Sequence, residues 1–289
     1  MNMKKILVLT MILMLQMTNA QNGFFSGKGD NQNMGDLFNT NCCLMGKGVI
    51  NGDVGLAYSK ITYANVEGGY TDFDRLATNV NLTVKLYKDL QIRTSFYFDL
   101  NDNENKPHWL SNMFYAIGYY NWRNNTFSYG YENYQPNKFD GSFNFFDNMK
   151  RGFFFTSFNH YLIKDNGALK LDESSQIYVS PFVRYSPEYT NRTGTTVLGN
   201  NKIVLGTSMR YVIWKNIYVE GAVYYYPQKD VKLPWDPDYT YGFGLFNWRS
   251  FKLNLSYGNW IANRFSAKDK EMKNDFMNGE FKAVFTFAW

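Results

Sequence analysis

The sequence is poor in cysteine, histidine and proline. Its 289 residues include 2 Cys, 2 His and 7 Pro. A small secreted scaffold held by disulfides carries many more cysteines, and the adjacent Cys42 and Cys43 are poorly placed to bridge each other. Two histidines without any Cys/His spacing also argue against a transition-metal site. We therefore expect no disulfide framework, no metal and no cofactor.

After residue 20 the chain also has no long apolar run and no cluster of basic residues. No later segment approaches the run of about eighteen apolar residues that a transmembrane helix needs. The formal net charge is +5, spread along the chain. Nucleic acid is therefore not an expected partner. Hydropathy alone would suggest a soluble protein.

The start of the chain does contain an apolar run, but a short one. Two lysines precede an apolar stretch that ends near Leu15, and small residues stand at Thr18 and Ala20, the third-last and last positions before the expected cut. This pattern predicts a secretory signal peptide over residues 1–20, and the run is too short for a membrane anchor. No cysteine stands at the cut, which excludes a lipoprotein. We expect a single domain over residues 21–289.

What the sequence has in abundance is aromatic residues and alternation. It contains 23 Tyr, 25 Phe and 7 Trp. In RLATNVNLTVKLY, residues 75–87, apolar residues and Thr78 occupy the even positions and mainly polar residues the odd ones. After Lys88-Asp89, the segment LQIRTSFYFDL, residues 90–100, alternates again. Two such runs joined by a tight turn predict a β-hairpin whose strands are long enough to cross a membrane at a tilt.

The same unit recurs along the chain. Strands are expected near 52–63, 75–87, 90–100, 111–122, 126–134, 151–163, 176–185, 202–213, 217–226, 239–246, 251–260 and 276–289. The connections alternate between mostly short and long polar ones, such as 135–150 and 186–201. In lipid every backbone group must be paired, which a closed sheet achieves. The sequence therefore predicts an all-β, closed antiparallel up-and-down transmembrane barrel of about twelve strands, with both termini on the periplasmic side.

The chain ends in AVFTFAW, residues 283–289, which places Phe285, Phe287 and Trp289 on one face of an extended strand. This ending resembles the C-terminal signature strand of bacterial outer-membrane β-barrel proteins, and strand number and size resemble those of the small solute-specific porins. The resemblance implies recognition of these three residues by the barrel-assembly machinery, and location in the outer membrane of a Gram-negative bacterium. Alternation independently predicts that they face lipid, with Trp289 in an aromatic girdle.

If the apolar face meets lipid, the other face lines the lumen. The charged residues expected there are Lys85, Arg93, Arg184, Arg210, Lys252 and Lys282, with Asp99, Glu132, Glu220 and Glu280. The cations exceed the acids by two. Two interpretations remain open: an interior closed by Arg–carboxylate pairs, or a constricted, weakly anion-preferring channel. Strand 151–163 is apolar on both faces, so its inward side is not assigned.

Aromatic residues also fall on the inward faces. Those singled out for the lumen or its mouth are Tyr97, Tyr120, Tyr178, Tyr224 and Trp260. Interleaved with Arg and Asn they would form a stacking surface for sugar rings, although tyrosine and tryptophan also collect at the membrane interfaces of any barrel. The segments SYGYENY, residues 128–134, and SYGNW, residues 256–260, echo each other before long loops, as a binding-site mouth or as two solutions to one packing problem.

A catalytic role is not expected. Outer-membrane phospholipase barrels use a His and a Ser two residues apart on one strand face, whereas Ser157 lies three residues before His160 and therefore on the opposite face. His108 lies in a loop without a nearby nucleophile. The acidic loop around Asp99 and Asp102 has calcium-ligand chemistry, but we interpret it as an ordinary solvated, polar loop.

The leading hypothesis is a narrow passive channel for polar solutes, such as oligosaccharides or small anions, embedded in outer-membrane lipid. Lys85, Arg93, Arg184, Arg210 and Lys252 would present its charge, with Asp99 and Glu220 fixing their geometry. The alternative is a closed barrel that serves as an interaction or assembly component through its long outer loops. The sequence identifies neither the solute nor the oligomeric state.

Overall fold

The computed structural model describes residues 50–64, 70–101, 112–121, 123–133, 145–162, 175–190, 196–214, 216–246, 253–260, 263–265 and 275–288. Contacts within the chain divide it into two units, Met1–Asn33 and Met34–Trp289, and every described residue lies in the second. The predicted signal peptide therefore lies outside the described residues. No helix within these ranges is long and apolar enough to cross a membrane.

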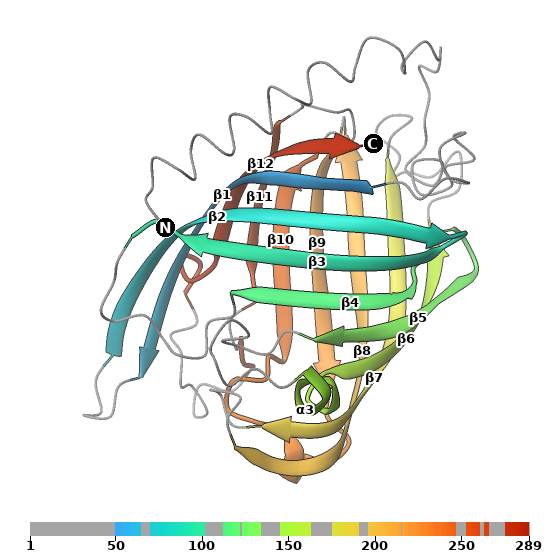
Figure 1. Ribbon diagram of the computed structural model, residues 1–289, viewed down its shortest axis with the longest axis vertical. Coiled ribbons are helices and arrows are strands. Elements are labelled where there is room, and N and C mark those ends of the chain that lie inside the picture. Colours follow the sequence, from blue (N-terminus) through green and yellow to red (C-terminus); the bar gives the residue numbers. More distant parts are fainter. Residues whose placement is uncertain are drawn as a thin grey trace. The chain divides into compact units, whose positions relative to one another are not determined.

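The described part of the chain forms one closed antiparallel barrel of twelve strands (Figure 1). They are β1 (Ile50–Ala64), β2 (Tyr70–Tyr87), β3 (Leu90–Asp99), β4 (Met113–Tyr119), β5 (Thr126–Asn133), β6 (Phe153–Tyr161), β7 (Gln176–Thr190), β8 (Val197–Trp214), β9 (Ile217–Tyr225), β10 (Tyr239–Leu245), β11 (Leu253–Asn259) and β12 (Glu280–Ala288). Each strand pairs with its neighbours in sequence, and β12 pairs with β1 to close the ring. The predicted fold class is confirmed.

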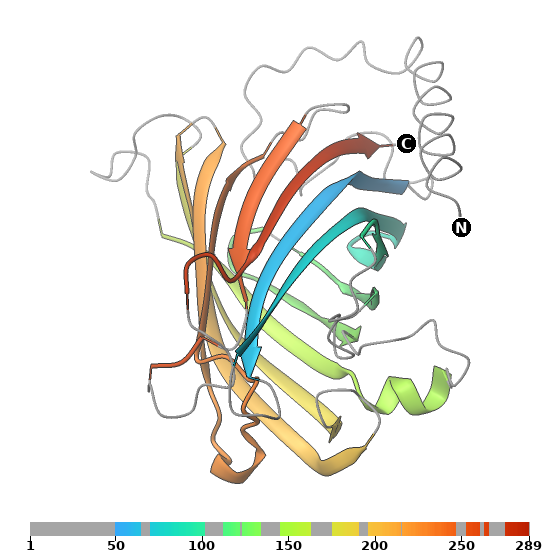
Figure 2. The same cartoon turned by 90° about the vertical axis from the view of Figure 1, so that its left-hand side faces the viewer.

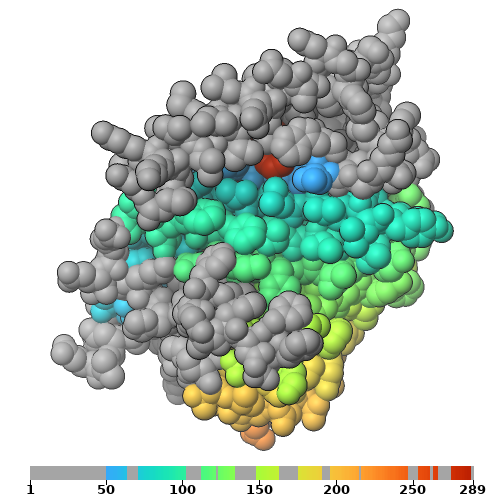
Figure 3. All heavy atoms as spheres, viewed as in Figure 1, coloured from blue at the N-terminus to red at the C-terminus, as the bar shows by residue number. Residues whose placement is uncertain are grey.

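The two faces of the strands can be assigned from one contact. The side chains of Tyr97 on β3 and Lys282 on β12 meet, although β1 and β2 lie between these strands. Only the concave side of a closed sheet allows this, so both side chains point into the lumen. The alternate side chains, among them Leu56, Ile92 and Phe98, are exposed on the outside. The side chains of β2 to β4 form a continuous outer surface (Figure 3).

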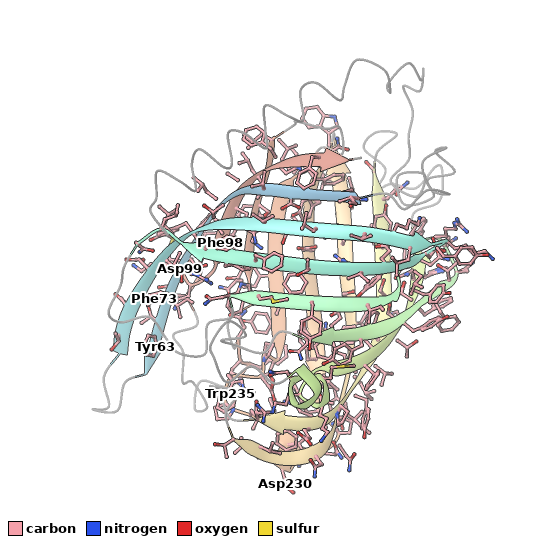
Figure 4. All side chains as sticks on the ribbon, viewed as in Figure 1. Tyr63, Phe73, Phe98, Asp99, Asp230 and Trp235 are labelled. Carbon is pink, nitrogen blue, oxygen red and sulfur yellow. The ribbon has the colours of Figure 1, made fainter. Side chains whose placement is uncertain are left out.

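Four strands are much longer than the others. β1 and β7 have 15 residues and β2 and β8 have 18, whereas the remaining strands have 7 to 10. The expected loop at 186–201 is therefore wrong in extent, because the pairing of β7 with β8 continues through Glu188 and Asn200 to Thr190 and Val197. The first long hairpin carries Tyr63 and Phe73 near its tip (Figure 4).

The predicted alternation of short and long connections holds only in part, because the stretch between β7 and β8 (191–196) is shorter than the one between β6 and β7 (162–175). Tight turns join β2 to β3 and β8 to β9, with Lys88 at φ 48° and Asn216 at φ 71°. Asparagine tolerates this left-handed region better than most residues. At the other end, the β7–β8 hairpin, helix α3 (Phe145–Lys150) and the β9–β10 connection with its short 3-10 helix η2 (Lys229–Val231) lie together (Figure 2).

The barrel consists of two similar halves, β1–β6 and β7–β12. Each strand of the second half begins 126 or 127 residues after its counterpart in the first. Contacts repeat with the same spacing. Tyr58 donates to Asp74 over 2.8 Å, and Tyr185 donates to Asn201 over 2.7 Å.

A second repeated feature is a hydrogen-bond cluster around an asparagine, which we call the asparagine device. In each half it links the fifth strand to the connection that precedes the last strand. The buried Asn133 amide donates to the Tyr115 hydroxyl at 3.2 Å, and the buried Asn259 amide donates to the Tyr241 hydroxyl at 3.0 Å. Beside them, Tyr131 and Tyr257 donate to backbone carbonyls of the connection. Gly152 and Gly279 lie against these two rings, where a Cβ would clash.

Candidate functional site

One wall of the lumen, from β12 to β3, is closed by side chains that satisfy each other. The Lys282 ammonium lies 2.7 Å from a Glu280 carboxylate oxygen and donates to the Tyr97 hydroxyl at 2.8 Å. Ala57 and Ala77 lie beneath this layer and are almost completely buried. Lys282, Ala57, Ala77 and Asp99 form one row across four strands. Small residues in the middle of the row leave room for long side chains to meet above them.

The same wall continues toward the end with the long connections. Arg75 on β2 pairs with Asp99 on β3, and its guanidinium carbon lies 4.9 Å from the centre of the Tyr97 ring. Arg75 is buried and Asp99 is one-fifth exposed. Asp99, expected to face the lumen, lies at the end of β3 (Figure 4). Arg75 and Asp99 therefore neutralise each other, as Lys282 and Glu280 do.

The opposite wall carries a guanidinium, that of Arg184, to which no carboxylate of the described ranges is paired. The Arg184 guanidinium carbon on β7 lies 4.8 Å from the ring centres of Phe153 and Phe182 and 5.6 Å from that of Tyr224. We call these four residues the Arg184 box. Among the described residues no acid lies within ion-pair distance of Arg184. All four side chains are partly accessible, so the box is open to the lumen.

Next to the box, Arg210 on β8 pairs with Glu220 on β9. The Arg210 Nε donates to a Glu220 oxygen at 2.9 Å, and a terminal nitrogen donates to the same oxygen at 2.5 Å. The two side chains remain 37% and 35% exposed. The guanidinium also lies 4.8 Å from the Tyr218 ring centre. This pair lies along the wall between adjacent strands and does not cross the lumen.

Arg93 on β3 also faces the lumen, and no carboxylate of the described residues lies within ion-pair distance of it. It lies 4.7 Å from the centre of the Tyr120 ring, just beyond β4. The Tyr120 hydroxyl donates to Glu132 on β5 at 3.2 Å. Arg93 and Glu132 therefore both contact Tyr120, and the Asp53 carboxylate acts on Arg93 electrostatically without forming an ion pair.

The remaining predicted residues lie toward the two rims. Lys85 lies 3.9 Å from Asp89 at the β2–β3 turn. Tyr178 donates to Gln176 and packs edge-on against Tyr161, with ring centres 4.6 Å apart. Trp260 follows β11 and is 42% exposed. Lys252 and Trp289 lie outside the described residues.

The C-terminal strand provides the closing edge of the barrel. Nine of its residues pair with β1, from Glu280 to Ala288. Phe285 is 41% exposed on the outer face, whereas Phe287 on the same face is only 6% exposed. The Phe287 ring lies over Gly52, where a Cβ would come within 3.1 Å of it. Its role as an assembly signal remains a prediction.

Ion pairs tie the β9–β10 connection to the barrel. Lys202 on β8 pairs with Asp236, and Lys232 and Arg264 both pair with Asp238. Trp235 lies in this connection (Figure 4). Burial of Asp238 raises its pKa, but hydrogen bonds from Lys232 and from the Phe265 amide outweigh it and hold the pKa below its ordinary value.

The residues considered for catalysis are separate. His160 Nδ1 lies 2.7 Å from the Asn125 side chain, and Ser157 pairs with Phe182 on the inward face. His108 lies outside the described residues. Within the described ranges no group of three or more His, Cys, Asp or Glu is placed to hold a metal ion.

Sequence reasoning missed two parts of the wall. Phe153 was not assigned because β6 is apolar on both faces, and Asp53, which accepts a hydrogen bond from Asn81 in the lumen, was not considered. The repeat was also missed, although Asn-Trp-Arg occurs at 121–123 and again at 247–249. The two Ser-Tyr-Gly segments are not in equivalent register, because Tyr131, and not Tyr129, corresponds to Tyr257.

Comparisons with known proteins give no family. No protein-family model and no curated protein matches the sequence. Among solved structures, an outer membrane channel from Pseudomonas putida F1 is similar over 83% of this chain and 96% of its own, at 12% identity and a TM-score of 0.32. Salmonella typhi OmpF in complex with daunomycin is similar over 83% of this chain and 97% of its own, at 11% identity and a TM-score of 0.33. Because both scores are low, the function proposed below is derived from the barrel itself.

Proposed function

We propose that this protein is an outer-membrane barrel whose lumen is a narrow, passive, anion-preferring channel for polar solutes. The observation that carries this proposal is the pair of guanidinium groups, Arg93 and Arg184, that face the lumen with no carboxylate of the described residues within ion-pair distance. The Asp53 carboxylate acts on Arg93 only from a greater distance. Guanidinium groups that face a lumen without an ion-pair partner attract anions. The exposed apolar outer face, with residues such as Leu56 and Ile92, supports the membrane location.

The accessibility of the charges supports a channel over a closed interior. The Arg210 and Glu220 side chains are each about one-third exposed although they face inward. Such exposure means that the surrounding side chains leave free space beside them. The predicted signal peptide and the C-terminal strand fit export and insertion by the barrel-assembly machinery.

Planar-bilayer recording of the refolded mature chain across a potassium chloride gradient tests the proposal. We expect discrete conductance steps and a reversal potential on the anion-selective side. Arg93→Ala and Arg210→Ala should each shift that potential toward cation selectivity, since each removes a positive charge from the lumen. Unchanged potentials in both variants would remove these residues from the conducting path.

The second candidate is a closed barrel that acts as an interaction or assembly component. The layer in which Lys282, Glu280 and Tyr97 bond to one another favours this second candidate, because these side chains occupy one side of the lumen. A folded barrel that is electrically silent in the same recordings would support this candidate and exclude the channel.

A further inference from the structure

The two halves of the barrel place different chemistry at equivalent positions of the lumen wall. With the 127-residue spacing, Tyr97 corresponds to Tyr224 and Ala57 to Arg184, while Lys282 corresponds to Phe155. The row Lys282–Ala57–Ala77 in one half therefore becomes Phe155–Arg184–Val204 in the other. In the first half Tyr97 meets Lys282 across two intervening strands, and in the second half Tyr224 meets Arg184 and Phe182 across one, β8.

The difference lies in how the charge is neutralised. In the first arrangement Lys282 has Glu280 at 2.7 Å and Tyr97 at 2.8 Å, so every polar group is satisfied internally. In the second, the position of Glu280 is taken by Phe153, and Arg184 is surrounded by rings. If packing alone were required at position 184, a small residue such as Ala57 would serve, as it does in the other half. Since the described part of the barrel supplies Arg184 with no carboxylate, a solute in the lumen is the source of counter-charge considered for it.

The surroundings of Arg184 indicate which chemical group would supply its counter-charge. Rings that approach the guanidinium carbon at 4.8–5.6 Å stabilise the cation without accepting its strong N–H hydrogen bonds. A carboxylate fits the planar fork of guanidinium donors with two parallel hydrogen bonds. The aromatic faces of Tyr224 and Phe182 offer an apolar surface to a ring attached to that carboxylate.

We propose that the Arg184 box binds a carboxylate carried on a sugar ring, so that the solute of the channel is an acidic sugar. The carboxylate pairs with the Arg184 guanidinium, and the apolar face of the sugar packs against Tyr224. This inference rests on the proposed channel function and specifies its solute class. It requires both the charge and the rings, which distinguishes it from general attraction of anions by a basic lumen.

Current blockade by D-glucuronate tests the proposal, with D-glucose and acetate as probes that each carry only half of its chemistry. In wild-type channels we expect glucuronate to reduce the potassium chloride current at about tenfold lower concentration than either comparison probe, since one good charge-assisted interaction is worth about a factor of ten in affinity. Arg184→Gln should remove that advantage, and Arg184→Lys should restore only part of it. Lys88→Gln, an equal charge change at an exposed turn, should behave as wild type.

The outcomes separate the two proposals. A conducting barrel that glucuronate blocks no better than acetate, or that Arg184→Gln leaves equally sensitive, overturns the acidic-sugar site and leaves the channel intact. A folded barrel that does not conduct overturns the channel. Calorimetric titration of glucuronate into the detergent-solubilised barrel then decides the site: binding that Arg184→Gln abolishes supports it, and absence of binding overturns it. Heat-modifiability on gels shows that each variant is folded.

Discussion

The two halves of the barrel agree where they build the scaffold and differ where they face the lumen. The Tyr58–Asp74 and Tyr185–Asn201 bonds correspond, as do the two asparagine devices at the ends of β5 and β11. In the lumen, by contrast, Thr83 and Arg93 stand where the second half has Arg210 and Glu220. Repeated contacts therefore report what any half-barrel needs to fold, and the unmatched charges report what this lumen does.

The comparison also separates cations held by the fold from cations presented to solutes. Lys282 and Arg75 are enclosed by acids and tyrosines. Arg184 and Arg93 contact rings but no carboxylate in the described part of the barrel. The first pair should influence stability and the second pair selectivity.

The largest expected effect is on the free energy of unfolding, when one cation of each kind is replaced. Lys282→Met leaves Glu280 without its cation and should lower the free energy of unfolding by ~2–3 kcal/mol, somewhat less than for a fully buried pair because Lys282 is one-quarter exposed. Arg184→Met breaks no ion pair and should change it far less. Denaturant unfolding of both variants in lipid vesicles, followed by tryptophan fluorescence, measures the difference. Equal losses would show that Arg184 also serves the fold.

A smaller effect tests whether the asparagine devices are equivalent. Asn133→Ala and Asn259→Ala each remove the amide that donates to a half-buried tyrosine hydroxyl and to a loop carbonyl. Each should cost ~1–2 kcal/mol of unfolding free energy, and the double variant should show the sum because the sites lie in different halves. If only one substitution destabilised the barrel, the two sites would share the same geometry but would not contribute equally to stability.

The exposed tyrosine bonds should matter least to global stability. Tyr58→Phe and Tyr185→Phe each remove one hydrogen bond that water can replace, so we expect losses below ~0.5 kcal/mol for both. Thermal unfolding of the two variants beside wild type would reveal this. A large loss in either would mean that its long hairpin is held chiefly by that bond.

A local effect is expected in the β9–β10 connection. Because the pKa of Asp238 is lowered in the folded protein, its ion pairs stabilise the connection above about pH 4, the ordinary value for an aspartate, and are lost as the pH falls through the lowered pKa. Asp238→Asn should speed hydrogen exchange of the Phe265 amide at pH 6, because that amide donates to Asp238. Once the carboxyl is protonated at lower pH, the two proteins should exchange alike. A persistent difference there would assign the protection to another contact.

Period-two alternation was sufficient to predict the fold. Lipid on one side and polar lumen on the other impose opposite chemistry on successive residues, so the sequences around Leu76 and Ile92 reveal both strand and face. Strand ends were less predictable, because β7 and β8 continue as a paired hairpin beyond the part with clear alternation. β6 resisted assignment because Phe153 and Phe155 face inward among other rings.

Whether each charged residue has an ion-pair partner could not be predicted from alternation. Arg93 and Arg210 look alike in sequence, yet only Arg210 has a glutamate directly opposite on the neighbouring strand. Such pairing depends on the register between strands, which a single sequence does not state. The pairing of Tyr97 with Lys282 depends further on closure, since these strands are neighbours only across the curve of the wall.

Because the two halves match, the barrel has two equivalent joints between halves. The joint between β12 and β1, which seals the barrel, is the counterpart of the joint between β6 and β7 in the middle of the chain. Neither half is complete alone, because each leaves two unpaired edges that lipid cannot satisfy. Each half therefore supplies the strands that pair both edges of the other half. The order of the two halves along the chain decides only which of the two joints is covalently connected.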